Sequence, residues 1–294
     1  MLFDHAAVPA HSSGSTAPTD PPAWTSSARI QNYLLGGRDY YERDRELAER
    51  MNAKAPFLTD AFHYERQYVL AMIQALAIAG VRQLLDFGCG LPHRPSPVEV
   101  ITRVQPDARV VCIDRDRTVH AHGRALLQAP APAVLEHLEA DVCDAQTILA
   151  SPEVLKTINW HEPVILLFGS VLHHIRDTPA HPVAVLINQY KEIAAPGSAL
   201  VITHATADFA GKPIRKAAKF MAKAGCPLYL RSRDEVMPLF DGWALSAPGL
   251  AAPQEMTLEH PVGEEADVVC GHGLEGERPM SARRGAHRRV PTSR

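Results

Sequence analysis

The chain has 294 residues, 46% of them hydrophobic, and its 30 basic residues face 33 acidic ones for a formal net charge of −3. This length fits one large domain or two small ones, at about 100–200 residues per domain. The near-neutral charge disfavours a dedicated nucleic-acid binder, which normally has a strong basic excess. The sequence has no run of about 18 apolar residues, so no membrane-spanning helix and no membrane partner are expected.

The cysteines and the first residues indicate the compartment. The five cysteines, at positions 89, 112, 143, 226 and 270, are odd in number, widely spaced and without a CxxC pair. We therefore expect neither a disulfide framework nor a metal site. The segment MLFDHAAVPAHSSG lacks the basic and continuous apolar stretches of a secretory signal. These features predict a soluble, reduced, cytoplasmic protein.

Both ends of the chain are poor in core-forming patterns. Residues 1–26 are rich in Pro, Ser, Thr and Ala and contain no Lys or Arg, which predicts a disordered leader. Residues 259–294 are predicted to be a disordered, solvated tail, with five Arg within 281–294. A tether for nucleic acid or for another acidic partner is the less favoured interpretation of those arginines.

Helical patterns come first between these ends. A polar helix is predicted over 43–54 and an apolar-periodic helix over 61–79, and Gly80 stands where a C-terminal glycine is favoured. Residues 27–80 are therefore interpreted as an N-terminal helical cap.

Residues 81–258 alternate between short apolar runs and helical stretches. The predicted strands lie within 81–88, 108–116, 134–141, 163–170 and 198–205, and the predicted helices at 96–105, 117–128, 144–157, 181–194 and 212–224. Near-continuous apolar strands separated by helices predict a parallel sheet covered on both faces, which is a doubly wound α/β domain.

The strand ends carry the candidate chemistry, because ligands of open α/β sheets bind outside the carboxyl ends of the strands. The first strand runs through Asp86 into Gly88-Cys89-Gly90, whose glycines permit a sharp turn and close approach to a ligand. The second ends at Asp114, where a carboxylate can accept hydrogen bonds from both ribose hydroxyls. We expect Asp116, rather than Asp114, to cap the following helix.

The third strand ends at Asp141 and Val142, where a carboxylate and a backbone N–H can read an adenine edge, and Asp144 is expected to be a helix N-cap. The third glycine of a dinucleotide motif is replaced by His93, and Pro92 and Pro95 delay the helix whose N-terminus would bind a pyrophosphate. A cofactor with ribose and adenine but no phosphate fits better, and S-adenosylmethionine (SAM) is such a cofactor.

These motifs, together with SVLHHIRD at 170–177, resemble those of class I SAM-dependent methyltransferases. Over residues 26–250 the chain is similar to the actinobacterial S-adenosyl methyltransferase family, formerly a domain of unknown function. That similarity is carried by SSARIQNYLLGGRDYYERDRELAER, RQLLDFGCGLP and APGSALVITHAT. The resemblance implies a seven-stranded, mostly parallel, Rossmann-like methyltransferase sheet and SAM binding, and no particular acceptor. The sequence departs from the family pattern at Glu65-Arg66, where Asn-Arg is expected, and from about residue 256 onward.

The N-terminal segment has two open interpretations. It is either a helical layer with Arg38–Asp39 and Arg43–Asp44 as surface charges, or a lid in which Gly36-Gly37 turns the chain and Tyr33 closes over the cofactor. Arg66 is a candidate for the methionyl carboxylate, because arginine binds carboxylates bidentately. The predicted cofactor site comprises Tyr33, Arg66, Asp86, Gly88, Cys89, Gly90, Asp114, Arg115, Asp141, Val142 and Ser170.

The predicted function is methyl transfer from SAM to an unidentified small molecule. Orientation alone can supply about 7–11 kcal/mol, so a catalytic side chain is not obligatory. If a general base exists, His173 or His204 is the candidate, since each stands at or just beyond a strand end. The alternatives are a non-catalytic regulator that binds SAM or a nucleoside and, less favoured, an NAD-dependent oxidoreductase.

Overall fold

The computed structural model describes residues 24–246, 249–252 and 268–274. The predicted leader up to residue 23 and the arginines at 281–294 lie outside the described residues. Among the described residues, no helix is both long and apolar enough to cross a membrane.

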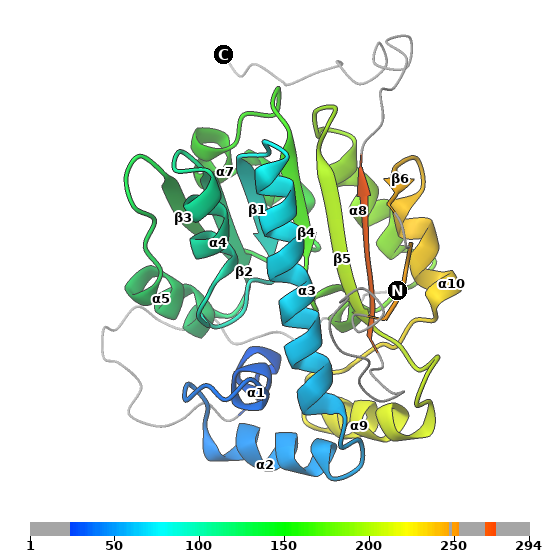
Figure 1. Cartoon of the computed structure of the whole chain (residues 1–294). Helices are drawn as coiled ribbons and strands as arrows, with labels where there is room; N and C mark the ends of the chain where they lie inside the picture. The colour runs from blue at the N-terminus through cyan, green and yellow to red at the C-terminus, as the bar shows by residue number, and fades with distance from the viewer. Residues whose placement is uncertain (1–23, 247–248, 253–267, 275–294) are drawn as a thin grey trace, which may run out of the picture.

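The described strands form one sheet in the order β3-β2-β1-β4-β5-β7-β6 (Figure 1). They are β1 (Gln83–Phe87), β2 (Arg109–Asp114), β3 (Val134–Glu139), β4 (Val164–Phe168), β5 (Ala199–Ala205), β6 (Ala244–Leu245) and β7 (Val268–Leu274). The five predicted strands are confirmed and run parallel to one another. The strand order reverses between β1 and β4, which places a switch point at the carboxyl ends of these two strands.

Strand β7 lies inside the segment predicted to be a disordered tail, so that prediction is wrong for residues 268–274. It pairs antiparallel with both β5 and β6. The sequence misleads here because Gly271 and Gly273 suggest a loop. A Cβ on Gly271 would lie 2.5 Å from Cδ2 of Leu250, and one on Gly273 would lie 3.0 Å from Cδ1 of Phe240. These glycines therefore serve close packing within the sheet.

Each predicted helix is present, one of them divided in two, and the helices Ser27–Leu34 and Arg233–Val236 are additional. The helices are α1 (Ser27–Leu34), α2 (Glu42–Asn52), α3 (Leu58–Ile78), α4 (Pro97–Val104), α5 (Arg117–Leu126), α6 (Ala145–Ala150), α7 (Pro152–Thr157), α8 (Val183–Lys191), α9 (Lys212–Lys223) and α10 (Arg233–Val236), with 3₁₀ turns η1 (Leu172–His174) and η2 (Met237–Phe240). The single helix predicted over 144–157 is two, because Ser151 caps a new helix that begins at Pro152. The predicted N-caps Asp116 and Asp144 are confirmed.

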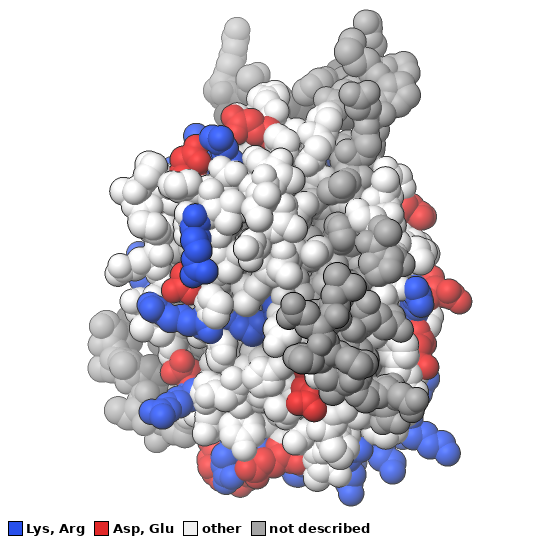
Figure 2. All heavy atoms as spheres, in the orientation of Figure 1, with Lys and Arg blue, Asp and Glu red and all other residues white. Residues whose placement is uncertain are grey.

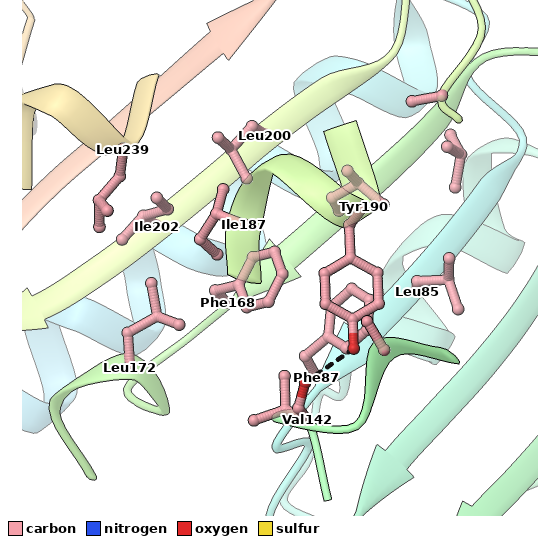
Figure 3. Close-up of a cluster of buried hydrophobic side chains, with 14 of the residues drawn as sticks. Leu85, Phe87, Val142, Phe168, Leu172, Ile187, Tyr190, Leu200, Ile202 and Leu239 are labelled. Carbon is pink, nitrogen blue, oxygen red and sulfur yellow. Dashed lines mark hydrogen bonds between the residues drawn. The ribbon is translucent and has the colours of Figure 1, made fainter. Parts of the chain in front are cut away.

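Apolar side chains cover both faces of the sheet. Helices α3 and α4 pack on one face, and α6, α7, α8 and η2 pack on the other. On the second face Phe87 and Phe168 stack with ring centroids 4.4 Å apart, and Tyr190 lies against both rings (Figure 3). The Tyr190 hydroxyl donates a 2.8 Å hydrogen bond to the Val142 carbonyl, which ties the chain after β3 to this core.

Helices α1, α2 and α9 lie beyond the lower end of the strands, and α3 runs from them along the front of the sheet (Figure 1). A third apolar cluster, which includes Ile30, Leu47 and Ile214, joins these helices. Asp44 is buried and accepts a 2.6 Å hydrogen bond from Nε of Arg29, which is itself 2% exposed. The interpretation of Arg43–Asp44 as surface charges is therefore wrong for Asp44, because its side chain points inward and pairs with Arg29 on the preceding helix, α1.

Candidate active site

A cavity of about 1320 Å³ lies at the carboxyl ends of the strands. One wall consists of residues at or just after the carboxyl ends of β1, β2, β3 and β4; we call it the sheet-edge wall. The opposite wall consists of side chains from α1, α2, α3 and α9, together with Phe57 just before α3, and we call it the helical wall. Of the predicted site residues, Gly88, Gly90, Asp114, Arg115, Asp141, Val142, Ser170 and His173 line this cavity.

The turn after β1 is shaped by its two glycines. Gly88 and Gly90 have φ values of +69° and +65°, which glycine adopts far more easily than other residues. A Cβ on Gly88 would lie 2.5 Å from Cγ2 of Val171, so no side chain fits there. The intervening Cys89 packs against the core between the sheet and α3–α4 and is not among the cavity-lining residues described.

Asp114 is held in place by the turns around it. Its Oδ2 accepts a 3.1 Å hydrogen bond from the Gly90 N–H, and its Oδ1 accepts one of 2.9 Å from the Asp116 N–H. Burial raises the pKa of the Asp114 carboxyl. Asp86 lies on β1 behind this position, and burial together with the Asp114 charge raises the pKa of its carboxyl to about 7. The structure thus places Asp114 on the cavity and Asp86 behind it.

The ends of β3 and β4 complete the sheet-edge wall. Asp141 accepts a 2.9 Å hydrogen bond from the Cys143 N–H, and its Oδ2 lies 3.3 Å from Nη1 of Arg115. Ser170 has a φ of +51°, a strained value for a residue with a side chain. Its N–H donates to Oγ1 of Thr203, which in turn donates a 2.6 Å hydrogen bond to Oε1 of Glu65. Glu65 thereby links the helical wall to the β4 end.

Two predicted cofactor contacts are placed elsewhere. The Tyr33 hydroxyl donates to Oε1 of Glu49 on α2, and the ring packs edge-on against Tyr40. Nη2 of Arg66 donates to the carbonyls of His93 and Pro95, so it braces the chain leading to α4. Neither residue is among the described residues that line the cavity. In this structure Tyr33 does not cover the cavity and Arg66 does not reach it, because both side chains are engaged with other parts of the chain.

The helical wall contributes residues that the sequence interpretation passed over. On α1 they include Ser27, Ile30 and Gln31, and on α3 they are Leu58, Ala61, Phe62 and Glu65. The α3 residues are spaced i, i+3, i+4 and i+7, which is one face of a helix. This spacing can be recognised in the sequence, and the acidic Glu65 on an otherwise apolar helix face is the signal that could have indicated a binding site. Burial raises the pKa of the Glu65 carboxyl.

Neither predicted general base has a suitable geometry. His204 is fully buried, its Nδ1 donates to the Ala205 carbonyl, and its Nε2 accepts from Nη1 of Arg231. Burial and the Arg231 charge lower the pKa of His204 to about 3. His173 lines the cavity, but its Nδ1 accepts a 3.2 Å hydrogen bond from the Ala205 N–H. The neutral ring therefore carries its proton on Nε2, which leaves no unshared acceptor nitrogen.

The site fits a cationic nucleoside better than a pyrophosphate. The cavity lining described includes five carboxylates, Glu65, Asp114, Asp116, Glu139 and Asp141, against the three arginines Arg115, Arg117 and Arg176. Helix α4 begins with a capping box in which Glu99 accepts from the Ser96 N–H and Ser96 accepts from the Glu99 N–H. A carboxylate at this helix N-terminus disfavours a bound phosphate. The residues present therefore suit SAM, whose sulfonium is positively charged.

Comparison with known proteins agrees with this chemistry. A family model described as S-adenosyl methyltransferase matches residues 19–274. The chain is similar to a DUF574 family protein from Streptomyces avermitilis MA-4680, at 28% identity and a TM-score of 0.80 over 86% of this chain and 98% of that one. It is also similar to a Thermobifida fusca YX protein described as a proposed methyltransferase, at 31% identity and a TM-score of 0.79 over 86% and 96% of the two chains.

Among proteins of curated function, none matches the chain. The family match spans most of the sequence and reaches the end of β7. The chain therefore belongs to the S-adenosyl methyltransferase family and is a SAM-dependent methyltransferase.

Proposed function

We propose that the protein methylates a small molecule held between the sheet-edge wall and the helical wall. The observation that carries this proposal is that a single cavity joins the acidic strand ends to apolar side chains of the helices. Bound SAM supplies an activated methyl group on a sulfonium sulfur. The chain's own contribution is to bind, align and enclose the two reactants, which can account for much of the acceleration.

The sheet-edge wall suits the cofactor. The backbone at Gly88 and Gly90 can approach a ligand closely, and the Asp114 carboxylate lines the cavity with lone pairs left to accept from two ribose hydroxyls. Asp141 and the Val142 N–H suit the adenine edge. Glu65 presents a buried carboxyl on the same cavity. We propose that the Glu65 carboxyl lies next to the positively charged part of the cofactor, because opposite charges attract strongly where water is excluded.

The helical wall suits the acceptor. Its side chains are mostly apolar and include Met51, Phe57, Phe62, Ile214 and Met221. These side chains favour an acceptor with an apolar body.

The N-terminal helices act as a cap in this proposal. Oγ of Ser26, the residue before α1, donates a 2.8 Å hydrogen bond to Oδ2 of Asp116 on the sheet-edge wall. This contact fastens the start of α1 across the cofactor site, so the helices exclude water from the reacting atoms.

Calorimetric titration of the full chain with SAM, S-adenosylhomocysteine (SAH) and NAD tests the cofactor side. SAM and SAH are expected to bind in the micromolar range, and NAD is expected to give no binding heat, because α4 offers no phosphate site. Equal binding of NAD and SAM would overturn the proposal. Tight SAM binding without methyl transfer to any small molecule would favour a regulatory protein instead.

A further inference from the structure

The adjacent His173 and His174 have opposite hydrogen-bonding patterns. Nδ1 of His173 faces a backbone N–H, whereas Nδ1 of His174 lies 3.0 Å from the carbonyl oxygen of Pro227. A carbonyl oxygen only accepts, so Nδ1 of His174 must carry the proton. Its Nε2 then has an available lone pair, and no described residue forms a hydrogen bond with that nitrogen.

His174 is also held firmly at the cavity. It is partly exposed and lines the cavity together with Gly88, Asp114 and Ser170. His174 lies on η1, and this turn is held in place because Arg231 donates hydrogen bonds to the carbonyls of Leu172 and Ile175.

The segment after α9 also forms hydrogen bonds with η1. The Tyr229 N–H donates a 2.7 Å hydrogen bond to the His173 carbonyl, and the Pro227 carbonyl sets the orientation of the His174 ring. A base held by its other ring nitrogen in this way keeps both its tautomer and its direction.

We propose that His174 is the general base of the methyl transfer and that the acceptor is an apolar small molecule with a hydroxyl or amine group. This inference rests on the proposed function. As the acceptor oxygen or nitrogen forms a bond to the methyl carbon, the carbon–sulfur bond breaks and its electron pair stays on sulfur. The acceptor proton passes to Nε2 of His174, and the imidazolium later releases it to water.

The surroundings keep this imidazole neutral before the reaction. Burial and the positive charge of Arg115 lower the pKa of His174, while the hydrogen bond to Pro227 opposes that shift. Other titratable groups near this ring include His173, with a ring centroid 4.6 Å away, and the buried His204. A neutral imidazole at pH 7 can accept a proton.

Nitrogen NMR of protein labelled with ¹⁵N-histidine, with SAH bound, tests the tautomers directly. His174→Gln and His173→Gln assign the two rings, and His161→Gln, at the exposed amino end of β4, is the matched control. At pH 7 His174 is expected to be protonated on Nδ1 and His173 on Nε2. A His174 ring protonated on Nε2, or charged at pH 7, would overturn the proposal.

Release of SAH from SAM, measured over a panel of phenols, alcohols and amines, tests the chemistry. With an acceptor that is turned over, His174→Gln should lower kcat by about 100-fold or more at pH 7, with SAH affinity unchanged and His161→Gln equal to wild type. For a phenol, the deficit should shrink at high pH, where the acceptor ionises unaided. Turnover by His174→Gln at the wild-type rate would overturn the inference. If SAM binds but the wild type turns over no panel member, the proposed function fails instead, and the tautomer measurement remains the test of His174. Failure of SAM and SAH to bind would instead refute the proposed function.

Discussion

The sheet-edge wall and the helical wall are built in different ways. At the sheet edge, Gly88, Asp114 and Ser170 lie at or just after the ends of strands, and hydrogen bonds of backbone N–H groups hold their positions. The helical wall gathers side chains from helices that are far apart in sequence, since α9 begins about 180 residues after α1. The first wall follows from strand geometry, whereas the second exists only when the helices have packed together.

Their stabilising interactions differ as well. The sheet has apolar layers on both faces. The helical wall has a smaller apolar cluster and the buried Arg29–Asp44 pair. Its outer surface at the lower end of the molecule carries charges of both signs, with Lys and Arg gathered on one side of it (Figure 2). The comparison suggests that the helical wall depends on a few polar contacts that single substitutions can remove.

The largest effect is expected for Asp44→Ala. Removing one partner of a buried ion pair leaves Arg29 charged and uncompensated, which costs about 3–5 kcal/mol. Asp44 also accepts from the Ser26 N–H, so the start of α1 should loosen and SAH affinity should fall with stability. Chemical denaturation and calorimetry measure both. Glu46→Ala, an exposed acid on the same helix, is the control, and an unchanged unfolding free energy for Asp44→Ala would contradict the role of the pair.

Leu166→Ala on β4 should lower the free energy of unfolding by about 2–5 kcal/mol, because it leaves a cavity in a fully buried layer. SAH affinity measured under folding conditions should stay at the wild-type value. Leu166→Ala should therefore lower stability without lowering SAH affinity, whereas Asp44→Ala should lower both. If the two variants lost SAH affinity equally, the sheet core and the helical wall would not act independently on binding.

Asp114→Ala should weaken SAM binding by about 1–3 kcal/mol, because two ribose hydroxyls would lose their acceptor. Asp144→Ala is the matched control, since this acid caps α6 through the Thr147 N–H. Calorimetric titration of the two variants compares them directly. Equal SAM affinity in the wild type and Asp114→Ala would show that the ribose does not contact Asp114.

The smallest expected effect is the pH dependence of SAM affinity. The pKa of Asp86, raised to about 7, leaves this carboxyl partly protonated at neutral pH. The sulfonium charge favours the carboxylate, so SAM binding should release a proton and tighten about tenfold from pH 6 to pH 8. SAH, which lacks that charge, should show a smaller change. Asp86→Asn should flatten the SAM profile, and an unchanged slope in that variant would assign the pH dependence to another group.

Much of the sheet-edge wall was predictable because its signals are local. An apolar run of five or six residues forms a strand, two glycines permit the turn after β1, and an acid two residues into a turn caps a helix, as Asp116 does. The order of such features along the chain also indicated the binding edge, because parallel strands bring their carboxyl ends together.

The sequence by itself determined the parallel α/β core, the Gly88-Cys89-Gly90 turn, the place of Asp114 and the similarity to a methyltransferase family. Tertiary structure alone decided that Asp44 pairs with Arg29, that Gly271 lies in a strand, and that Arg66 braces the loop before α4. It also decided which of the neighbouring His173 and His174 has an available nitrogen. The physical reason is that a hydrogen-bond partner or a close contact from a distant segment sets a side chain's direction, and no local pattern encodes that partner.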